Sequence, residues 1–199
     1  LYSGIYYLES RGYRPEEIFR IGKTLKNKAK RYYTVDNSIY ENRKSAGNVI
    51  DKEAGILNRG NLTRLKNFLN RAAQGERLTV GFIGGSITQG FAATEPDQCY
   101  AARTVAWLRK VFPNTEFDYV NAGIGATNSQ FGAARVQEDL LCRLPDLAMV
   151  EFSVNDHCTP HDMETYEGLI RQIYGSRSCP AMVLLHSVYY DTGKSAAYY

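Results

Sequence analysis

The sequence has little net charge, few cysteines and no long apolar run. Its formal net charge is only +3, which is too small to indicate a nucleic-acid partner. No apolar run approaches the roughly 20 residues that span a bilayer, so we expect no transmembrane segment. The chain begins at Leu1 rather than Met, so we expect a fragment or a processed product, and its cellular location stays open.

The four cysteines are not spaced in close pairs, which argues against a disulfide framework. Cys142 and Cys179 lie beside apolar segments, where we expect reduced and buried thiols. Residues 157–161 include two histidines and a cysteine, but Pro160 interrupts them and no second ligand cluster accompanies them. We therefore expect no metal site and no other cofactor.

The composition, 44% hydrophobic and 23% charged, is that of one globular domain with an N-terminal extension. Residues 1–60 form the extension. Within it, Pro15 is typical of a helix start, and we expect a helix to about residue 32 with a basic, solvated face. Residues 34–57 lack a sustained period and indicate a linker or an irregular arm. Residues 61–199 form the domain.

From Asn61 onward, helix-like and strand-like segments alternate. Asn61 can cap a helix that Gly75 ends, and further helical spacing follows at residues 100–111, 129–144 and 163–173. Apolar runs typical of buried strands lie at residues 78–83, 117–120, 147–152 and 181–186. The alternation predicts an α/β domain of three layers, with a parallel sheet covered by helices on both faces.

Residues that carry chemistry follow the first three predicted strands. After the first strand, Gly84 and Gly85 carry no Cβ, so the backbone can take positive φ and approach a ligand closely in a tight turn that exposes Ser86. By itself, this turn is equally typical of a glycine-rich connection with a serine helix cap. A glycine-rich loop at residues 121–129 follows the second strand, and Asn155 follows the third. Parallel strands end at one edge of their sheet, so we expect these groups to converge.

Other glycine motifs fit this chain less well. Asn128 stands where a dinucleotide fingerprint has its third glycine. No Gly-Lys-Ser or Gly-Lys-Thr follows either glycine turn, which argues against a phosphate-binding P-loop. Thr88 stands where the Gly-x-Ser-x-Gly elbow of α/β-hydrolases has its second glycine.

The three blocks, in this order and each after a strand, resemble those of the SGNH hydrolases, also called the GDSL esterase and lipase family. Gly85 stands where many members have aspartate, and Ser153 replaces the usual glycine before the asparagine. The resemblance covers about residues 61–190. It implies a flavodoxin-like fold of three layers, whose final strand and helix we expect to lie beyond Tyr199.

The resemblance also implies roles for particular residues. Ser86 would be the nucleophile, and its N–H would help to bind the oxyanion together with the side-chain amide of Asn155. A third donor would be the backbone N–H of Gly125 or of Ala126, depending on the alignment, and we favour Gly125. Substrate-binding residues are not indicated.

The fourth block of the family, Asp-x-x-His, does not occur up to Tyr199. We therefore expect the general base to be missing from this chain and the chain alone to be inactive. Of the histidines present, His186 ends the fourth predicted strand, where we expect it to pack or to form hydrogen bonds within the fold. His157 and His161 follow Asn155 on a loop. We assign catalysis to none of the three.

The function that the resemblance implies is a serine esterase that hydrolyses acyl esters, chiefly acetyl esters on carbohydrate. The 15 tyrosines are consistent with a sugar substrate. Two alternatives stay open: an O-acyltransferase on the same fold, with a sugar hydroxyl in place of water, and a non-catalytic carbohydrate-binding module. The expected partner is a small-molecule or carbohydrate ester, and the oligomeric state is left undetermined.

Overall fold

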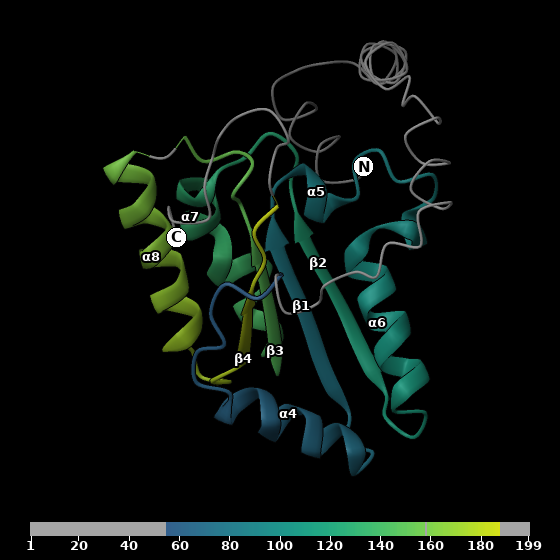
Figure 1. Ribbon diagram of the computed structural model, residues 1–199. Coiled ribbons are helices and arrows are strands. Elements are labelled where there is room, and N and C mark those ends of the chain that lie inside the picture. Colours follow the sequence, from purple (N-terminus) through teal and green to yellow (C-terminus); the bar gives the residue numbers. More distant parts are fainter. Residues whose placement is uncertain (1–54, 158, 188–199) are drawn as a thin grey trace. The chain divides into compact units, whose positions relative to one another are not determined.

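A computed structural model describes residues 55–157 and 159–187, which form a sheet with helices on both faces (Figure 1). The strands β1 (Leu78–Gly84), β2 (Phe117–Gly123), β3 (Leu147–Glu151) and β4 (Ala181–Leu184) run parallel in the order β2-β1-β3-β4. This arrangement confirms the predicted three-layer α/β fold. The predicted helix at residues 15–32 and the predicted fifth strand lie outside the described residues, and the division at residue 60 stays a prediction.

Among the described elements, two helices pack on each face of the sheet. Helices α4 (Thr63–Ala73) and α6 (Tyr100–Val111) cover one face, and α7 (Ser129–Asp139) and α8 (Pro160–Tyr174) cover the other. A short helix, α5 (Ser86–Gln89), follows β1 at the end of the sheet opposite α4 (Figure 1). Two 3₁₀ turns, η1 (Pro96–Gln98) and η2 (Leu141–Arg143), complete the described elements.

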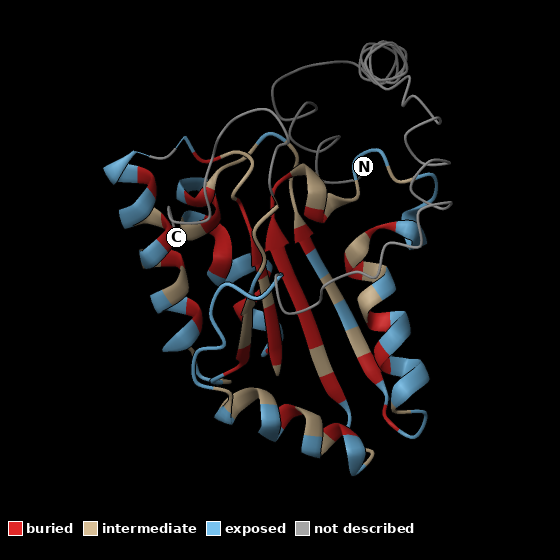
Figure 2. Ribbon diagram, viewed as in Figure 1, coloured by how far each residue is buried: buried red, intermediate tan, exposed pale blue. Residues whose placement is uncertain are grey.

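The core consists of two apolar layers separated by the sheet, and β1 is buried almost from end to end (Figure 2). The layer under α4 and α6 includes Phe68, Val80, Phe82 and Val105, and the layer under α7 and α8 includes Ile83, Val136, Val150, Leu169 and Ile173. Burial on both faces explains why β1 and β3 read as largely apolar runs in the sequence, whereas β2, at the edge of the described sheet, alternates with exposed residues.

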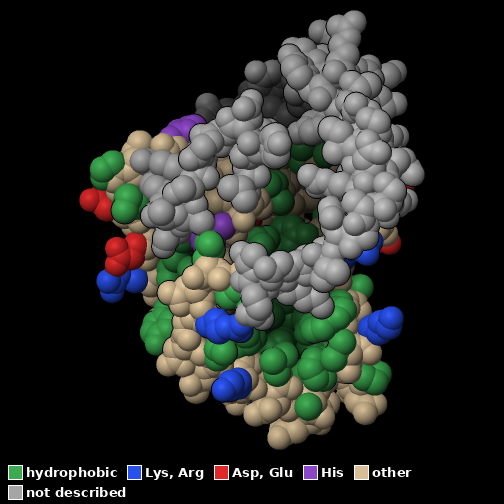
Figure 3. Space-filling model, in the orientation of Figure 1, with side chains coloured by type: hydrophobic (Ala, Val, Ile, Leu, Met, Phe, Trp, Pro, Cys, Tyr) green, Lys and Arg blue, Asp and Glu red, His purple; other side chains and the backbone are tan. Residues whose placement is uncertain are grey.

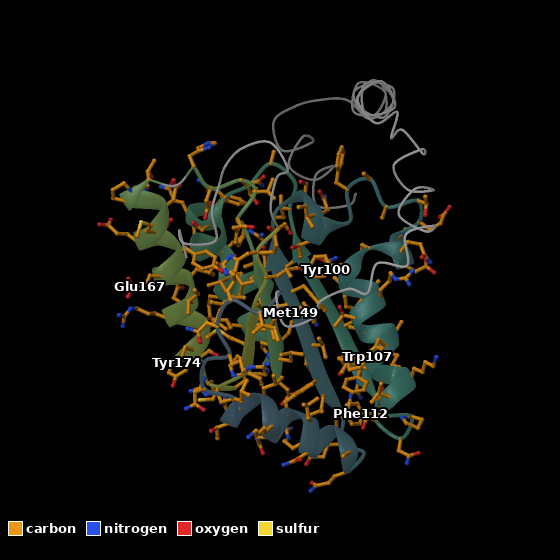
Figure 4. All side chains as sticks on the ribbon, viewed as in Figure 1. Tyr100, Trp107, Phe112, Met149, Glu167 and Tyr174 are labelled. Carbon is orange, nitrogen blue, oxygen red and sulfur yellow. The ribbon has the colours of Figure 1, made fainter. Side chains whose placement is uncertain are left out.

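The first face carries further apolar side chains that are not fully buried. Hydrophobic side chains gather in the lower half of the space-filling view, over the region of α4 and α6 (Figure 3). Met149 of β3 is half-buried in this layer, and Trp107 on α6 is 57% exposed (Figure 4).

Two predicted helix boundaries are wrong, for local reasons. Helix α7 ends at Asp139 rather than 144, because Leu144 takes a left-handed φ of +50° just before Pro145 and the intervening residues form η2. Helix α8 begins at Pro160 rather than 163. Thr159 Oγ1 accepts the Asp162 N–H at 3.2 Å, and Asp162 Oδ2 accepts the Thr159 N–H at 3.1 Å, which is a capping box.

The expected burial of two thiols is also wrong. Cys142 and Cys179 are exposed, because each lies in a turn beside an apolar segment rather than within one. The Cys142 Sγ donates to the Glu138 carbonyl at 2.8 Å, and Cys179 takes a φ of +46° before β4. Cys99, at the start of α6, is the buried cysteine among the three described, all of which are free thiols.

Candidate active site

The carboxyl ends of three neighbouring strands bring the predicted site residues to one edge of the sheet. In the strand register, Gly84 at the end of β1 pairs with Gly123 of β2 and with Glu151 of β3. Ser86 lies two residues after Gly84, and Gly125 lies two residues after Gly123. The topology alone therefore places the three loops beside one another, as the sequence predicts.

The glycines of the Ser86 turn are needed for space and not for a left-handed backbone. Gly85 has a φ of −84°, and Gly84 is not among the residues with positive φ, so neither glycine uses the positive φ that is open to it. A Cβ on Gly84 would overlap the Thr88 side chain and the Glu151 carbonyl, and a Cβ on Gly85 would overlap Asn155 Nδ2. The turn is tight because neighbouring chain segments press against its backbone.

The loop after β2 sits directly on the Ser86 turn. The Ile124 N–H donates to the Gly84 carbonyl at 3.0 Å. A Cβ built on Gly125 would lie 3.7 Å from Ser86 Cβ and 2.7 Å from Gln89 Oε1. The Gly125 N–H donates to Gln89 Oε1 at 2.9 Å. Gly125 is thus adjacent to Ser86, with its only backbone donor already engaged.

Asn155 joins the third loop to the other two. Its Nδ2 donates to the Thr127 carbonyl at 2.6 Å and lies against Gly85. The side chain is half-buried, and the amide has a second hydrogen beyond the one that Thr127 accepts. Ser86 is also half-buried, and its hydroxyl has no hydrogen-bond partner among residues 55–157 and 159–187.

Two buried charges that the sequence reasoning missed lie beneath these loops. Arg135 on α7 is 8% exposed; its Nη2 donates to the Gly84 carbonyl at 3.3 Å, and its Nη1 pairs with Asp139 at 2.8 Å. Glu151 is 1% exposed, and burial raises the pKa of its carboxyl, although the Ser153 hydroxyl, which donates at 2.9 Å, opposes that shift. The sequence did carry one signal of a buried charge, because Glu151 lies within the otherwise apolar run at residues 147–152.

A cavity of about 550 Å³ opens beside the amide of Asn155. Ala126 and Thr127 line it from the loop after β2, and Phe131 lines it from α7. Val154 and His157 complete the side formed by the loop after β3. The Phe131 ring is 48% exposed, so an apolar surface lies next to the polar groups. Such a mixture is typical of pockets that bind small organic molecules.

The three histidines lie on the loop after β3, in the first turn of α8 and after β4. His157 and His161 are exposed. His186 is half-buried after β4, with its ring 6.5 Å from that of Tyr166, and burial lowers its pKa. Within the described part of the chain, no three His, Cys, Asp or Glu residues are placed to hold a metal ion. None of its helices has the length and apolar character to cross a membrane.

The chain is similar to a known protein family and to solved structures of esterases. Residues 82–198, more than half of the chain, match the GDSL-like lipase/acylhydrolase family. A solved two-domain esterase (CEX) active on acetylated mannans, co-crystallised with mannopentaose, is 52% identical over 74% of this chain and 40% of its own, with a TM-score of 0.72. A second structure of such an esterase is 53% identical over 71% of this chain and 38% of its own, with a TM-score of 0.70.

Another solved esterase is less similar to this chain. An acetylxylan esterase from Geobacillus stearothermophilus is 23% identical over 54% of this chain and 58% of its own, with a TM-score of 0.43. No curated protein sequence matches the chain. The chain spans about 40% of the length of the two-domain esterase that it resembles at 52% identity.

Proposed function

The chain belongs to the GDSL-like lipase/acylhydrolase family, and from this membership we propose that it forms the Ser86 side of a serine esterase site. The reaction is the hydrolysis of acyl esters, chiefly acetyl esters on carbohydrate. The observation that carries the proposal is contact among three separate loops: Gly125 lies against Ser86, and Asn155 lies against Gly85. Nucleophile and oxyanion donors must meet in this way for acyl transfer.

The proposed reaction has two steps. In the first, Ser86 Oγ attacks the ester carbonyl, its proton passes to a general base, and the sugar hydroxyl leaves with that proton as an acyl-enzyme forms. In the second, water gives a proton to the same base and attacks the acyl-enzyme carbonyl. The bond to Ser86 Oγ breaks, the base returns the proton to that oxygen, and acetate is released. The base is the imidazole of the Asp-x-x-His block that the family resemblance implies, and this block does not occur among the 199 residues.

The oxyanion is held by donors from all three loops. Ser86 contributes its backbone N–H, and Asn155 contributes the Nδ2 hydrogen that Thr127 does not accept. The third donor is a backbone N–H of the loop after β2. It comes from Gly125 or from Ala126, and in this structure the Gly125 N–H is directed at Gln89.

The carbohydrate part of the substrate is supported by likeness and by the cavity. The two-domain esterase that is 52% identical is active on acetylated mannans. In this chain, the exposed Phe131 ring beside Asn155 offers an apolar face of the kind on which a pyranose ring stacks. We therefore propose a mannan-type acetyl ester as the substrate.

The test uses the intact protein that contains this chain, with acetylated mannan as substrate and released acetate as the readout. Ser86→Ala removes the nucleophile, and we expect it to abolish release. Ser176→Ala is the matched control. Ser176 lies just after α8, and its hydroxyl donates to the Ile173 carbonyl within that helix at 2.8 Å, so we expect the variant to keep native activity. Acetate release by Ser86→Ala at the native rate would contradict the proposal.

The same assay decides between the alternatives. Acetyl groups that appear on an added sugar acceptor rather than as acetate would identify an O-acyltransferase. Binding of mannan by the native protein without either product would identify a carbohydrate-binding module.

A further inference from the structure

Gln89 connects the helix that carries Ser86 to the loop that carries the candidate backbone donors. It is the last residue of α5, three positions after Ser86, and its side chain is half-buried. Its Oε1 accepts the Gly125 N–H at 2.9 Å. A Cβ on Gly125 would lie only 2.7 Å from this oxygen, so the amide group lies tightly against the loop backbone.

The backbones of the two segments are in contact as well. A Cβ on Gly123 would lie 2.7 Å from Gln89 Cα and 2.6 Å from the Thr88 carbonyl carbon. On the other side, Asn121 Nδ2 donates to the Thr88 carbonyl at 2.8 Å, and Asn121 Oδ1 accepts the Gly123 N–H at 2.9 Å. Contacts with α5 therefore fix where the loop begins. The hydrogen bond from Gly125 to the Gln89 side chain adds a fixed point two residues further along the loop.

The bond to Gln89 decides which backbone N–H can serve the oxyanion. A backbone amide has one hydrogen, and that of Gly125 is directed at Gln89. The next residue, Ala126, lines the cavity beside Asn155 and takes a left-handed φ of +59°, which costs free energy for a residue with a side chain. No hydrogen bond is made by the Ala126 N–H within the described ranges.

The strained residue is held from both sides. Thr127 Oγ1 donates to the Ile124 carbonyl at 2.7 Å, and the Thr127 carbonyl accepts from Asn155. Gln89 on one flank and Asn155 on the other thus fix the peptide between Gly125 and Ala126. Preorganised donors of this kind need no reorientation when charge develops.

We propose that Gln89 is a positioning residue of the esterase site: by accepting the Gly125 N–H, it orients the loop so that the Ala126 N–H faces Ser86. This inference rests on the proposed function, because it concerns the oxyanion formed by attack of Ser86. The alternative donor, Gly125, leads to the opposite expectation for the same variant. If Gly125 were the donor, Gln89 would occupy the oxyanion site, and removing its amide would raise turnover.

The experiment uses the intact protein and the small ester 4-nitrophenyl acetate. Gln89→Met keeps the length of the side chain and removes the acceptor. We expect kcat to fall about 100-fold, the cost typical of a displaced catalytic group, while KM stays within about twofold. The control is Gln137→Met on the exposed surface of α7, for which we expect native kcat and KM.

A second variant separates positioning from general damage to the fold. Gln89→Glu keeps an acceptor oxygen at the same place but gains a negative charge as the pH rises. We expect the ratio of its kcat to that of the native protein to fall with increasing pH through the titration of the new carboxyl, because an anion beside the loop opposes a developing oxyanion. A merely structural Gln89 would give a ratio without this dependence.

The outcomes distinguish this inference from the proposed function. A kcat that is unchanged or raised in Gln89→Met, with Ser86→Ala inactive, overturns the role of Gln89 and leaves the esterase. A pH-independent ratio for Gln89→Glu overturns it as well. Native hydrolysis by Ser86→Ala overturns the proposed function itself.

Discussion

Replacing Asn155 by alanine separates catalysis from stability at this site. Among the described residues, the side chain makes one hydrogen bond, from Nδ2 to the Thr127 carbonyl at 2.6 Å. Losing a single bond of this kind costs about 0.5–1.5 kcal/mol of folding free energy. Asn155 is half-buried, so water can reach the Thr127 carbonyl once the side chain is gone, and no large cavity forms. We expect a destabilisation of about 1 kcal/mol.

The catalytic cost is expected to be larger than the cost in stability. Removal of one oxyanion donor typically lowers kcat about 100- to 1000-fold, which corresponds to about 3–4 kcal/mol in the barrier. KM with a small acetyl ester is expected to change little, because the donor is used only when the carbonyl oxygen becomes charged. The measurements are kcat and KM with 4-nitrophenyl acetate, and the free energy of unfolding in urea.

The control is an asparagine that also bonds one backbone group but lies at the other end of the sheet. Asn61 Oδ1 accepts the Thr63 N–H at 2.9 Å at the start of α4. We expect Asn61→Ala to lose a similar amount of stability and no activity. A kcat for Asn155→Ala within twofold of the native value would refute the oxyanion role.

Two further predictions concern the scaffold that holds the site. Gly132→Ala places a Cβ 2.6 Å from the Phe152 ring, and we expect a loss of about 1–3 kcal/mol in unfolding free energy, measured in urea. Hydrogen bonds from Thr159 hold the pKa of the Asp162 carboxyl below its usual range, so its stabilisation is present above the unfolded pKa and is lost as pH falls through the folded pKa. We therefore expect Asp162→Asn to be less stable than the native protein at pH 7, with the difference shrinking below about pH 4; an equal difference at pH 7 and pH 3 would contradict this.

Much of the fold could be predicted because it depends on patterns that are local in the sequence. The helical spacing of apolar residues predicted the bounds that α6 has in the structure, residues 100–111. Strands β1 and β3 appear as largely apolar runs because both faces of the sheet are covered at these strands. Helix ends were harder to predict. The capping box of Thr159 and Asp162 moves the start of α8 to Pro160, and the left-handed Leu144 shortens α7.

The site could be predicted only in part, because strand topology brings its residues together while side-chain partners fix its details. The positions of Ser86 and Asn155 follow from parallel strands that end at one edge. Gln89 and its partner Gly125 are 36 residues apart, and no spacing in the sequence links them. Likewise, Gly85 is explained by the close approach of Asn155, which is a contact between loops and not a local property of the turn.

The most direct test of the central claim is the covalent intermediate on Ser86. The intact protein is mixed with 4-nitrophenyl acetate, quenched in acid within the first turnovers and digested, and the peptides are weighed by mass spectrometry. We expect one added acetyl group on the peptide that contains Ser86, and none on that peptide from Ser86→Ala. Acetate release without acetylation of Ser86, or stable acetylation of another residue during turnover, would contradict the assignment of Ser86 as the nucleophile.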